Sequence, residues 1–405
     1  MKIIFIHIKE NAFLELNSNT VINNTMPKAC KPLILLSFFL MVEANLNNAK
    51  AQEVPEVAIG GALRFNYNLS TWKPAQKRRG GDFGYDLFRI NAKAAYKGIN
   101  LNAEYRLYSN AFGGGMLKQG WFGYHFDESN EIQLGLTQVP FGIQQYNSNN
   151  WFFNLPYYVG LEDDHDMGIK YIRTGDKVEY QLAFFKNAEE TRFGNTTEIT
   201  HSRYAYDVAG RNKEFNQLNG KFIYKFGNQL KHRLGVSGQY GRLFNLDTEE
   251  TGNHYGLAIH YELTYNDWNI KAEAMNISNN PANAAGMSRD EISMAAYGAA
   301  YKVAADFNIY TFTIARNIPL EWKPISSLKI YNDFGYMHKK KEGFDDSIMN
   351  VTGVLITAGN IYTYIDYAAG LNHSWLGGNY IDDFSSGTPG AGWEARFNVN
   401  IGYYF

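Results

Sequence analysis

A cluster of acidic residues near the middle of the chain could bind a divalent cation. Four carboxylates and one imidazole occupy five consecutive positions, Glu162-Asp163-Asp164-His165-Asp166. Carboxylate oxygens are ligands that Ca²⁺ and Mg²⁺ prefer in proteins. The segment lacks the glycine-punctuated spacing of an EF-hand loop, however, and clustered acids are often simply hydrated. We therefore interpret it as a solvated acidic loop and predict no metal.

Charged side chains also recur at every second position of several extended segments. In a β-strand such residues lie on one face, because successive side chains point to opposite sides. If that face surrounds a water-filled channel, its charges bias which ions pass. Nine basic and six acidic residues belong to this face, so a mild anion preference is one hypothesis and a solvated wall of paired charges is the simpler one. The basic residues are Arg64, Arg89, Lys93, Arg106, Lys170, Lys221, Lys271, Lys329 and Arg396, and the acidic ones are Glu104, Glu131, Glu179, Glu262, Glu273 and Asp333.

The segment from Ile143 to Asp166 is long and rich in aromatic residues. Such a loop is too apolar to stay extended in water. We expect it to fold against the inner wall of the strands that flank it, where it could narrow a channel; packing on the rim is the alternative. Its aromatic residues are Tyr146, Trp151, Phe152, Phe153, Tyr157 and Tyr158, and its acidic end carries Glu162, Asp163, Asp164 and Asp166.

The elements that would position these side chains are strands. Between positions 57 and 69, mostly apolar residues occupy the odd positions, and polar or small residues occupy the even ones. The last segment, 393–405, repeats this alternation, and segments 88–96, 99–107 and 255–265 share it. A period of two predicts strands with one apolar and one polar face.

Short connections alternate with long polar ones along the chain. Turn residues occur at Lys97-Gly98, Thr174-Gly175-Asp176, Gly227-Asn228 and Asn266-Asp267, and long polar stretches lie near 70–83, 142–166, 187–215, 277–290 and 372–391. Candidate strands of roughly 10 to 13 residues suit a tilted span of a bilayer better than a soluble sheet. We predict an all-β, antiparallel transmembrane β-barrel with long extracellular loops and short periplasmic turns. A soluble β-sandwich is the alternative.

The number of strands is ambiguous in one region. The sequence offers seventeen candidate spans, whereas closed single-chain bacterial barrels have an even number. Between residues 291 and 337, Ala304–Phe307 and Trp322–Pro324 each fit either a turn or a loop. We predict sixteen strands, with eighteen as the alternative, and a barrel of that size encloses water.

An export signal precedes the strands. The apolar run 33–42 is too short for a spanning helix, which needs roughly 20 residues, and fits the centre of a signal peptide. Lys28 and Lys31 supply the positive start, and a small-x-small signal ending at Ala51 predicts cleavage before Gln52. We expect residues 1–25 to be an over-long N-terminal extension, 26–51 a Sec signal peptide and 52–405 a barrel of the bacterial outer membrane.

Composition argues against several other classes of protein. Residues 52–405 contain no cysteine, which excludes disulfides and thiolate metal sites, and Cys30 precedes the apolar run, which argues against a lipid anchor. The same residues carry 33 basic and 37 acidic side chains, a balance that argues against nucleic-acid binding. No nucleophile-elbow, phosphate-loop or zinc-protease motif occurs. We expect neither enzyme activity nor a cofactor.

Two alternative functions and one exclusion remain. A lipid hydrolase would need a hydrogen-bonded serine and histidine, for which His201-Ser202 and His373-Ser374 are candidates. A closed structural or adhesive barrel is the second alternative. A plugged active transporter is not expected, because only residues 53–56 separate the cleavage signal from the first strand.

Several segments carry a family resemblance. Leu134–Gly142 (LGLTQVPFG), the aromatic loop after it and Glu162–Tyr171 (EDDHDMGIKY), together with 328–336, 353–355 and 361–366, resemble the phosphate-selective porin O/P family, most closely its Bacteroidetes branch. The resemblance implies a sixteen-stranded barrel, usually trimeric, with an inward-folded loop. It also implies that Phe405 is the C-terminal signal that barrel-assembly machinery recognises.

The expected function is passive diffusion of small hydrophilic solutes or ions across the outer membrane. Expected partners are outer-membrane lipid, lipopolysaccharide, the barrel-assembly machinery and further copies of the chain in a homotrimer. Members of the resembled family that select phosphate line the pore with a dense arginine ladder. Here the arginines are scattered and the loop is acidic, so phosphate selectivity is not expected.

Overall fold

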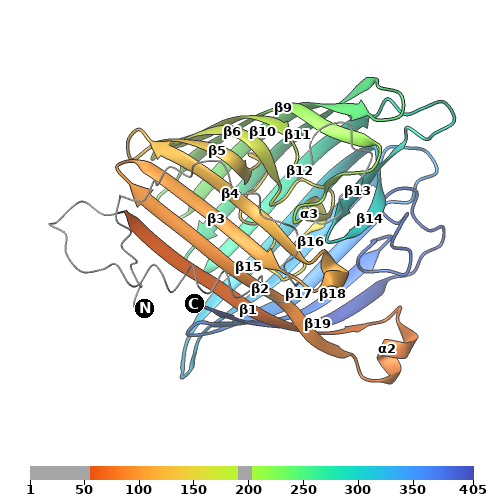
Figure 1. Cartoon of the computed structure of the whole chain (residues 1–405). Helices are drawn as coiled ribbons and strands as arrows, with labels where there is room; N and C mark the ends of the chain where they lie inside the picture. Colours follow the sequence, from red (N-terminus) through yellow and green to blue (C-terminus); the bar gives the residue numbers. More distant parts are fainter. Residues whose placement is uncertain (1–54, 190–202) are drawn as a thin grey trace, which may run out of the picture.

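Sixteen strands close into one antiparallel barrel in the computed structural model, which describes residues 55–189 and 203–405 (Figure 1). The prediction of a sixteen-stranded all-β barrel is confirmed. The barrel strands are β1 (Glu56–Ser70), β2 (Asp82–Tyr96), β3 (Ile99–Leu107), β4 (Gly115–His125), β5 (Asn130–Gln138), β6 (His165–Thr174), β7 (Val178–Asn187), β9 (Asn212–Phe226), β10 (Lys231–Asn245), β11 (Thr251–Tyr265), β12 (Trp268–Asn280), β15 (Asp306–Trp322), β16 (Ile325–Lys339), β17 (Ser347–Ala358), β18 (Ile361–Leu371) and β19 (Glu394–Tyr404). The expected extension 1–25, signal peptide 26–51 and cleavage site at Ala51–Gln52 lie outside the described residues.

Pairing of the first and last strands closes the barrel. Leu63 of β1 lies opposite Tyr403 of β19, and the backbone N–H of Gly61 donates to the carbonyl of Phe405 at 2.9 Å. A side chain at Gly61 would meet the Phe405 ring and the carbonyl of Arg89, with its Cβ 2.6 and 2.4 Å from the nearest atoms. Only glycine allows this approach, so the closing seam depends on its missing side chain.

The two ends of the barrel differ in the length of their connections. Seven turns of two to four residues join neighbouring strands at the end where β1 begins and β19 ends. The opposite end carries longer loops, among them 71–81, 139–164, 281–305 and 372–393. In outer-membrane barrels the short turns are periplasmic and the long loops extracellular, which orients the chain in its membrane. The 71–81 loop carries helix α2 (Pro74–Arg78), which projects beyond the wall in Figure 1.

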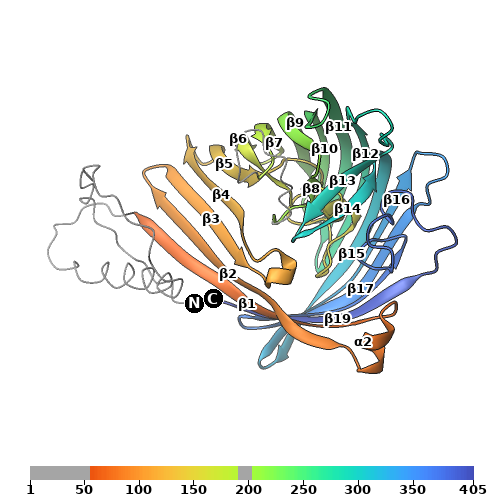
Figure 2. The same ribbon diagram turned by 45° about the vertical axis from the view of Figure 1, so that its right-hand side comes forward.

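The ambiguous region of the sequence contains a hairpin that does not cross the membrane. Strands β13 (Glu291–Ala296) and β14 (Ala299–Ala304) have six residues each, too few for a transmembrane strand. They pair with β8 (Asp207–Val208) in a separate three-stranded sheet that lies within the curve of the wall in Figure 2. Trp322–Ile325 forms a tight turn between β15 and β16. The seventeenth candidate span is therefore part of an inner sheet.

Apolar side chains cover the outside of the barrel. On β11, Tyr255, Leu257 and Ile259 are exposed, whereas His254, Ala258 and His260, at the alternate positions, are buried. The same alternation recurs around the wall and leaves a continuous ring of Leu, Ile, Phe and Tyr that would be unstable in water and suits acyl chains. No described helix is long and apolar enough to span a membrane.

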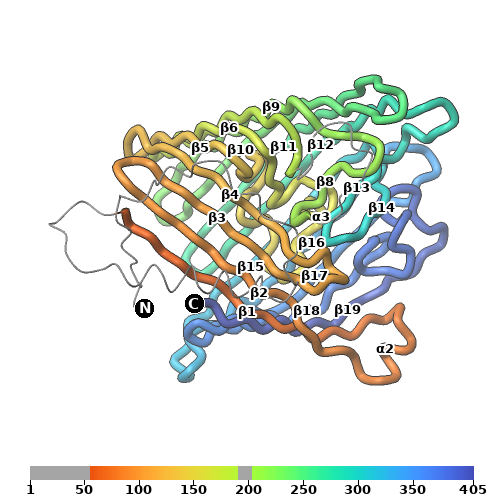
Figure 3. Tube along the Cα trace, viewed as in Figure 1, coloured from red at the N-terminus to blue at the C-terminus, as the bar shows by residue number. Residues whose placement is uncertain are grey.

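Aromatic packing fills the extracellular half of the interior. Short helix α3 (Leu155–Tyr158) and the inner sheet meet there, and the course of the loops through this half can be followed in Figure 3. The ring centre of Tyr206 lies 5.5 Å from that of Tyr301, and Tyr158 lies 6.1 Å from Phe384. These rings fill much of one end of the lumen, so any water-filled passage must run beside them.

A charge placed on the outer face should test the membrane-facing surface. Leu257 is 62% exposed near the middle of β11. We expect Leu257→Arg to lower the free energy of folding into lipid vesicles by about 2–4 kcal/mol, because the charge must enter the bilayer core. Gln239→Arg, which faces inward on the neighbouring strand, is the control and should stay within about 1 kcal/mol of the parent. Equal losses in urea titrations of both variants would contradict this orientation.

Candidate functional site

The loop of residues 139–164 turns into the barrel and binds the opposite wall. It leaves β5 and returns to β6, yet the backbone N–H of Gly142 donates to Ser237 Oγ of β10 at 2.9 Å. The N–H of Ile143 donates to Glu273 Oε1 of β12 at 2.8 Å, and Asn147 Nδ2 donates to Thr311 Oγ1 of β15 at 2.8 Å. The loop therefore crosses the lumen and does not pack on the rim.

Two buried carboxylates of the wall hold the middle of this loop. Asp333 Oδ2 on β16 accepts the backbone N–H groups of Asn149 and Asn150 at 2.7 and 3.1 Å. Asp366 Oδ2 on β18 accepts the N–H of Trp151 at 3.2 Å. Hydrogen bonds to charged acceptors are stronger than neutral ones, so these aspartates fix the loop at its tip.

Glu162 ties the end of the loop back to its middle. Its Oε1 accepts the backbone N–H of Asn147 at 3.0 Å and the hydroxyl of Ser148 at 3.2 Å. Burial away from water raises the pKa of the Glu162 carboxyl to about 8. This side chain is 3% exposed and serves the internal structure of the loop.

Asp163 binds the wall through a buried ion pair. Lys118 Nζ of β4 lies 2.6 Å from Asp163 Oδ2, and the hydroxyl of Tyr204 donates to the same oxygen at 2.5 Å. Burial raises the pKa of Asp163, but the ammonium of Lys118 outweighs it and holds that pKa below its ordinary value. Arg106 lies over the Tyr204 ring, 4.3 Å from its centre. A basic wall thus faces this end of the loop.

The acidic segment 162–166 is not solvated. Exposure of its five side chains ranges from 1% at His165 to 8% at Asp164, so the expectation of a hydrated acidic loop is wrong. Glu162 and Asp163 are buried because they bind the loop backbone and Lys118. Asp164 and Asp166 belong to a group of four carboxylates that also includes Glu189 and Asp207.

The expected basic residues on β1–β3 lie inside the barrel, and most are paired with carboxylates. Arg64 Nε lies 2.9 Å from Asp86 Oδ2. Glu104 Oε1 lies 2.6 Å from Arg106 Nε and 3.4 Å from Arg89 Nη1. Lys93 is exposed near the periplasmic turn of β2. Pairing cancels much of the positive charge on this side of the wall.

The basic residues elsewhere on the wall contact neutral groups. Lys170 Nζ donates to the carbonyl of Gln138 at 2.8 Å, and Lys221 Nζ donates to Gln144 Oε1 at 2.9 Å. Lys271 Nζ donates to the carbonyls of Tyr146 and Asn147. Arg396 packs over the rings of Trp72 and Phe152, and Lys329 is half-buried on β16.

A polar cavity of about 330 Å³ lies on the periplasmic side of the loop. Amide side chains dominate its lining, with three basic and two acidic residues among them. The lining includes Asn102, Gln119, Gln133, Gln138, Gln144, Gln145 and Gln181, with Lys170, Lys221, Arg233, Glu179 and Glu262. Trp121, Ile172 and Ile223 add a small apolar part to a surface that mainly offers hydrogen bonds to hydrated or hydroxylated solutes.

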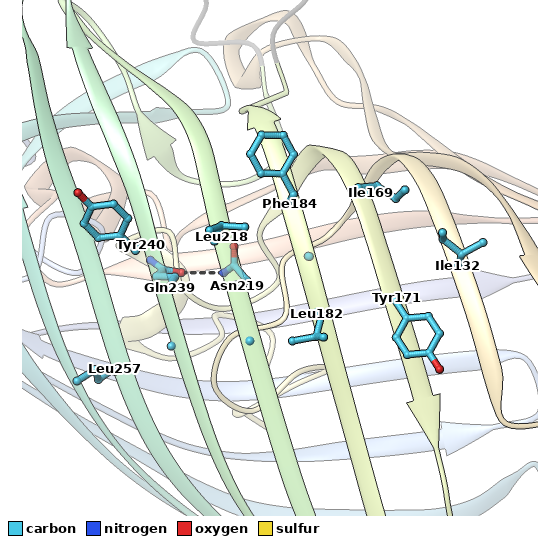
Figure 4. A pocket seen from close by; sticks show the side chains of 13 residues that line it. Ile132, Ile169, Tyr171, Leu182, Phe184, Leu218, Asn219, Gln239, Tyr240 and Leu257 are labelled. Atoms are coloured by element: carbon cyan, nitrogen blue, oxygen red, sulfur yellow. Dashed lines mark hydrogen bonds between the residues drawn. The ribbon is translucent and has the colours of Figure 1, made fainter.

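A larger hollow of about 730 Å³ lies on the outside of the wall (Figure 4). Leu182, Leu218 and Tyr240 line it, and Gly220 and Gly238 leave it open because they carry no side chain. Asn219 and Gln239 border it but hydrogen-bond to each other at 3.3 Å. Its lining is apolar and suits lipid chains, in contrast to the polar lining of the cavity in the lumen.

Of the two candidate pairs of the hydrolase alternative, His373-Ser374 lies in the described residues and forms no catalytic arrangement there. His373 Nδ1 accepts the backbone N–H of Trp375 at 3.2 Å, and neither His373 Nε2 nor Ser374 Oγ has a hydrogen-bond partner. Burial away from water lowers the pKa of His373 to about 3. His201-Ser202 lies outside the described residues.

Solved structures share this architecture at low sequence identity. OmpT, an outer membrane protein of Vibrio cholerae in a trimer form, is 14% identical, with a TM-score of 0.55 over 87% of this chain and 99% of its own. An anion-selective porin from Comamonas acidovorans is 10% identical, with a TM-score of 0.55 over 87% and 100%. The chain is an integral outer-membrane β-barrel.

The outer membrane channel DcaP of Acinetobacter baumannii also matches this barrel, at 10% identity and a TM-score of 0.55 over 89% of this chain and 100% of its own. No protein-family model and no curated protein sequence matches the chain. At these identities the likeness shows the fold alone.

Sequence reasoning missed two charged residues of the barrel interior for the same physical reason. Lys118 lies four and six positions before the outward-facing Phe122 and Tyr124, so strict alternation predicts that it points outward. A β-bulge at this point of β4 turns it inward instead. Asp86 is the extra residue of a bulge in β2. A bulge shifts the alternation by one residue, and a period-two pattern cannot locate it. Asp366, which follows the alternation regularly, could have been found.

Removal of a wall carboxylate should release the loop. We expect Asp333→Ala to lower the unfolding free energy by about 1–3 kcal/mol, because four donors from Asn149 and Asn150 lose their acceptor. Hydrogen exchange measured by mass spectrometry should rise over residues 147–151. Glu128→Ala, in an exposed periplasmic turn, should leave that exchange unchanged; faster exchange in both variants would argue against an anchoring role.

Proposed function

We propose that this barrel is an outer-membrane porin through which small hydrophilic solutes or ions diffuse passively. The observation that supports it most is the polar, amide-rich cavity enclosed by the wall beneath an inward-folded loop. An interior of this kind keeps water and polar solutes in a membrane whose core excludes both. The channel and porin named among the structural matches are consistent with this proposal.

A mild anion preference follows from which charges remain uncompensated in the cavity. Arg233 lies 2.8 Å from Glu179 and 3.3 Å from Glu262, so these charges largely cancel. Lys170 and Lys221 donate to neutral oxygens of Gln138 and Gln144. Their charges face the cavity without a carboxylate in hydrogen-bond contact, which favours anions.

Neutralising both lysines should reduce the anion preference. We expect Lys170→Gln combined with Lys221→Gln to lower the anion-to-cation permeability ratio about twofold, because two cavity charges are lost. Reversal potentials in planar bilayers under a KCl gradient measure this ratio. Lys77→Gln, on exposed helix α2, is the control and should leave it unchanged. A parent channel that favours cations would overturn the proposed preference.

A closed structural or adhesive barrel is a second candidate, because aromatic residues pack the extracellular half of the interior. Liposome swelling separates the two proposals. A porin admits small sugars and the vesicles swell, whereas a closed barrel leaves them unchanged. The absence of swelling together with the absence of single-channel current would favour the closed barrel.

We propose that the chain shares the barrel architecture of the phosphate-selective porin O/P family but not its selectivity for phosphate. Arg64, Arg89 and Arg106 each face a carboxylate. An arginine needs its guanidinium free to bind phosphate with two hydrogen bonds, so we do not propose phosphate selectivity.

Export and assembly form part of the same proposal. Residues 26–51 would act as the signal peptide, cleaved between Ala51 and Gln52, and residues 1–25 would be an extension without a role in export. Phe405, 51% exposed at the end of the closing strand, would be the signal for the barrel-assembly machinery. Lipopolysaccharide would surround the extracellular end.

We propose a homotrimer, and polar groups on the outer wall support it. Asn332 lies between the outward-facing Ile330 and Phe334 of β16. Its Nδ2 donates to Thr352 Oγ1 at 2.8 Å and Asn350 Oδ1 at 3.1 Å. Amides are costly against acyl chains and are common where membrane subunits pack together.

A bulky residue at this position should weaken association. We expect Asn332→Trp to shift the trimer to monomers in light scattering coupled to size exclusion, because the indole blocks close packing at β16–β17. Leu257→Trp, on lipid-facing β11, should leave the trimer intact. Unchanged trimers in both variants would place the interface elsewhere, and a monomeric parent would overturn the trimer.

A further inference from the structure

Four carboxylates from different segments meet at the extracellular end of the barrel interior. They are Asp164 at the end of the inward loop, Asp166 at the start of β6, Glu189 after β7 and Asp207 in β8. One oxygen from each lies within 4.8 Å of the others. The sequence places only the first two near each other; the fold brings in the other two.

The cluster contains buried oxygens that lack partners in the described part of the chain. Asp166 is 2% exposed; its Oδ2 accepts from Gln217 Nε2 at 3.3 Å, but its Oδ1 has no hydrogen bond. Glu189 Oε2 is also buried without one. The neighbouring Asp163 differs, because both of its carboxylate oxygens accept hydrogen bonds, Oδ2 from Lys118 and Tyr204 and Oδ1 from Gln138. Unsatisfied buried carboxylate oxygens are costly, so these oxygens indicate a ligand.

Among the described residues, the positive charge near the cluster is smaller than the negative charge of its four carboxylates. Arg203 Nη1 lies 3.1 Å from Asp207 Oδ2 and is the guanidinium that faces the group. Glu214, whose Oε1 lies 3.8 Å from His254 Nδ1, adds a further carboxylate beside Asp207. A cation among these oxygens would supply positive charge that the described residues lack.

We propose that Asp164, Asp166, Glu189 and Asp207 bind a Ca²⁺ ion. The donors are all oxygens, which Ca²⁺ prefers over the nitrogen and sulfur ligands of transition metals. Oxygens on opposite sides of Ca²⁺ are about 5 Å apart, a separation that the cluster matches and that exceeds the span of a Mg²⁺ shell. The extracellular side of the membrane supplies the ion.

Such an ion would add a further link between segments that already pack together. It would connect the end of the inward loop and β6 to the end of β7 and to β8 of the inner sheet. Binding stabilises the folded barrel, because the unfolded chain holds no such arrangement of oxygens. This proposal is independent of porin function, since a closed barrel would bind the ion equally well.

Calcium titration of the full chain in detergent free of lipopolysaccharide tests the site. After EDTA treatment, CaCl₂ should bind in isothermal titration calorimetry with one ion per chain and raise the melting temperature. Asp166→Asn should lose at least tenfold in Ca²⁺ affinity and should lack the rise. In EDTA this variant should melt no lower than the parent, because one repelling charge is gone. That result separates loss of the ion from misfolding.

Asp247→Asn is the matched control, since Asp247 is an exposed acid of the β10–β11 loop that pairs with Arg211. It should bind Ca²⁺ as the parent does. An equal rise in melting temperature for the parent and Asp166→Asn would overturn the site, as would a parent that binds no Ca²⁺ at millimolar concentrations. Mg²⁺ binding as tight as that of Ca²⁺ would overturn the assignment to calcium.

Discussion

A strand inside a bilayer finds no water for its backbone N–H and C=O groups, so each edge must pair with another strand. Here the requirement is met when β1 pairs with β19, in the register that sets Leu63 opposite Tyr403. Every other property of the molecule depends on that closure. It fixes which side chains point outward to lipid, and it creates an interior that residues far apart in sequence share.

The interior is organised by carboxylates that bind backbone. Glu273, Asp333 and Asp366 project from β12, β16 and β18 and accept N–H groups from the loop that enters between β5 and β6. Loop backbone inside a barrel would otherwise carry unsatisfied donors. The side chains of the wall therefore accept hydrogen bonds from the loop backbone, just as each wall strand accepts hydrogen bonds from its neighbours. Basic residues near β1–β4 are largely paired with acids, which leaves the amide-lined cavity by β6–β10 as the more open polar region.

Much of the wall could be predicted from local pattern, because membrane strands alternate strictly. The outward-facing Leu257 and Ile259 follow from a period of two, and so do the turns at Lys97-Gly98 and Asn266-Asp267. The sequence did not distinguish the inner hairpin of β13 and β14 from a barrel strand, because its residues also alternate. The hairpin differs from the wall only in the shorter length of its strands. Contacts such as that of Asp333 with Asn149 could not be predicted from the sequence, because they form only when the barrel closes. Bulges at Lys118 and Asp86 broke the pattern without a local signal.

The inner sheet also constrains the order in which the molecule assembles. β8 follows β7, whereas β13 follows β12, yet Val208 pairs with Met294 inside the finished wall. Contacts between distant segments incur a loop-closure entropy that nearby hairpins avoid. The hairpins of the wall can form in sequence, but this pairing must wait until the strands between its two halves are in place. We therefore expect the extracellular half of the lumen to be the last part to acquire its native packing, after the wall has closed around it.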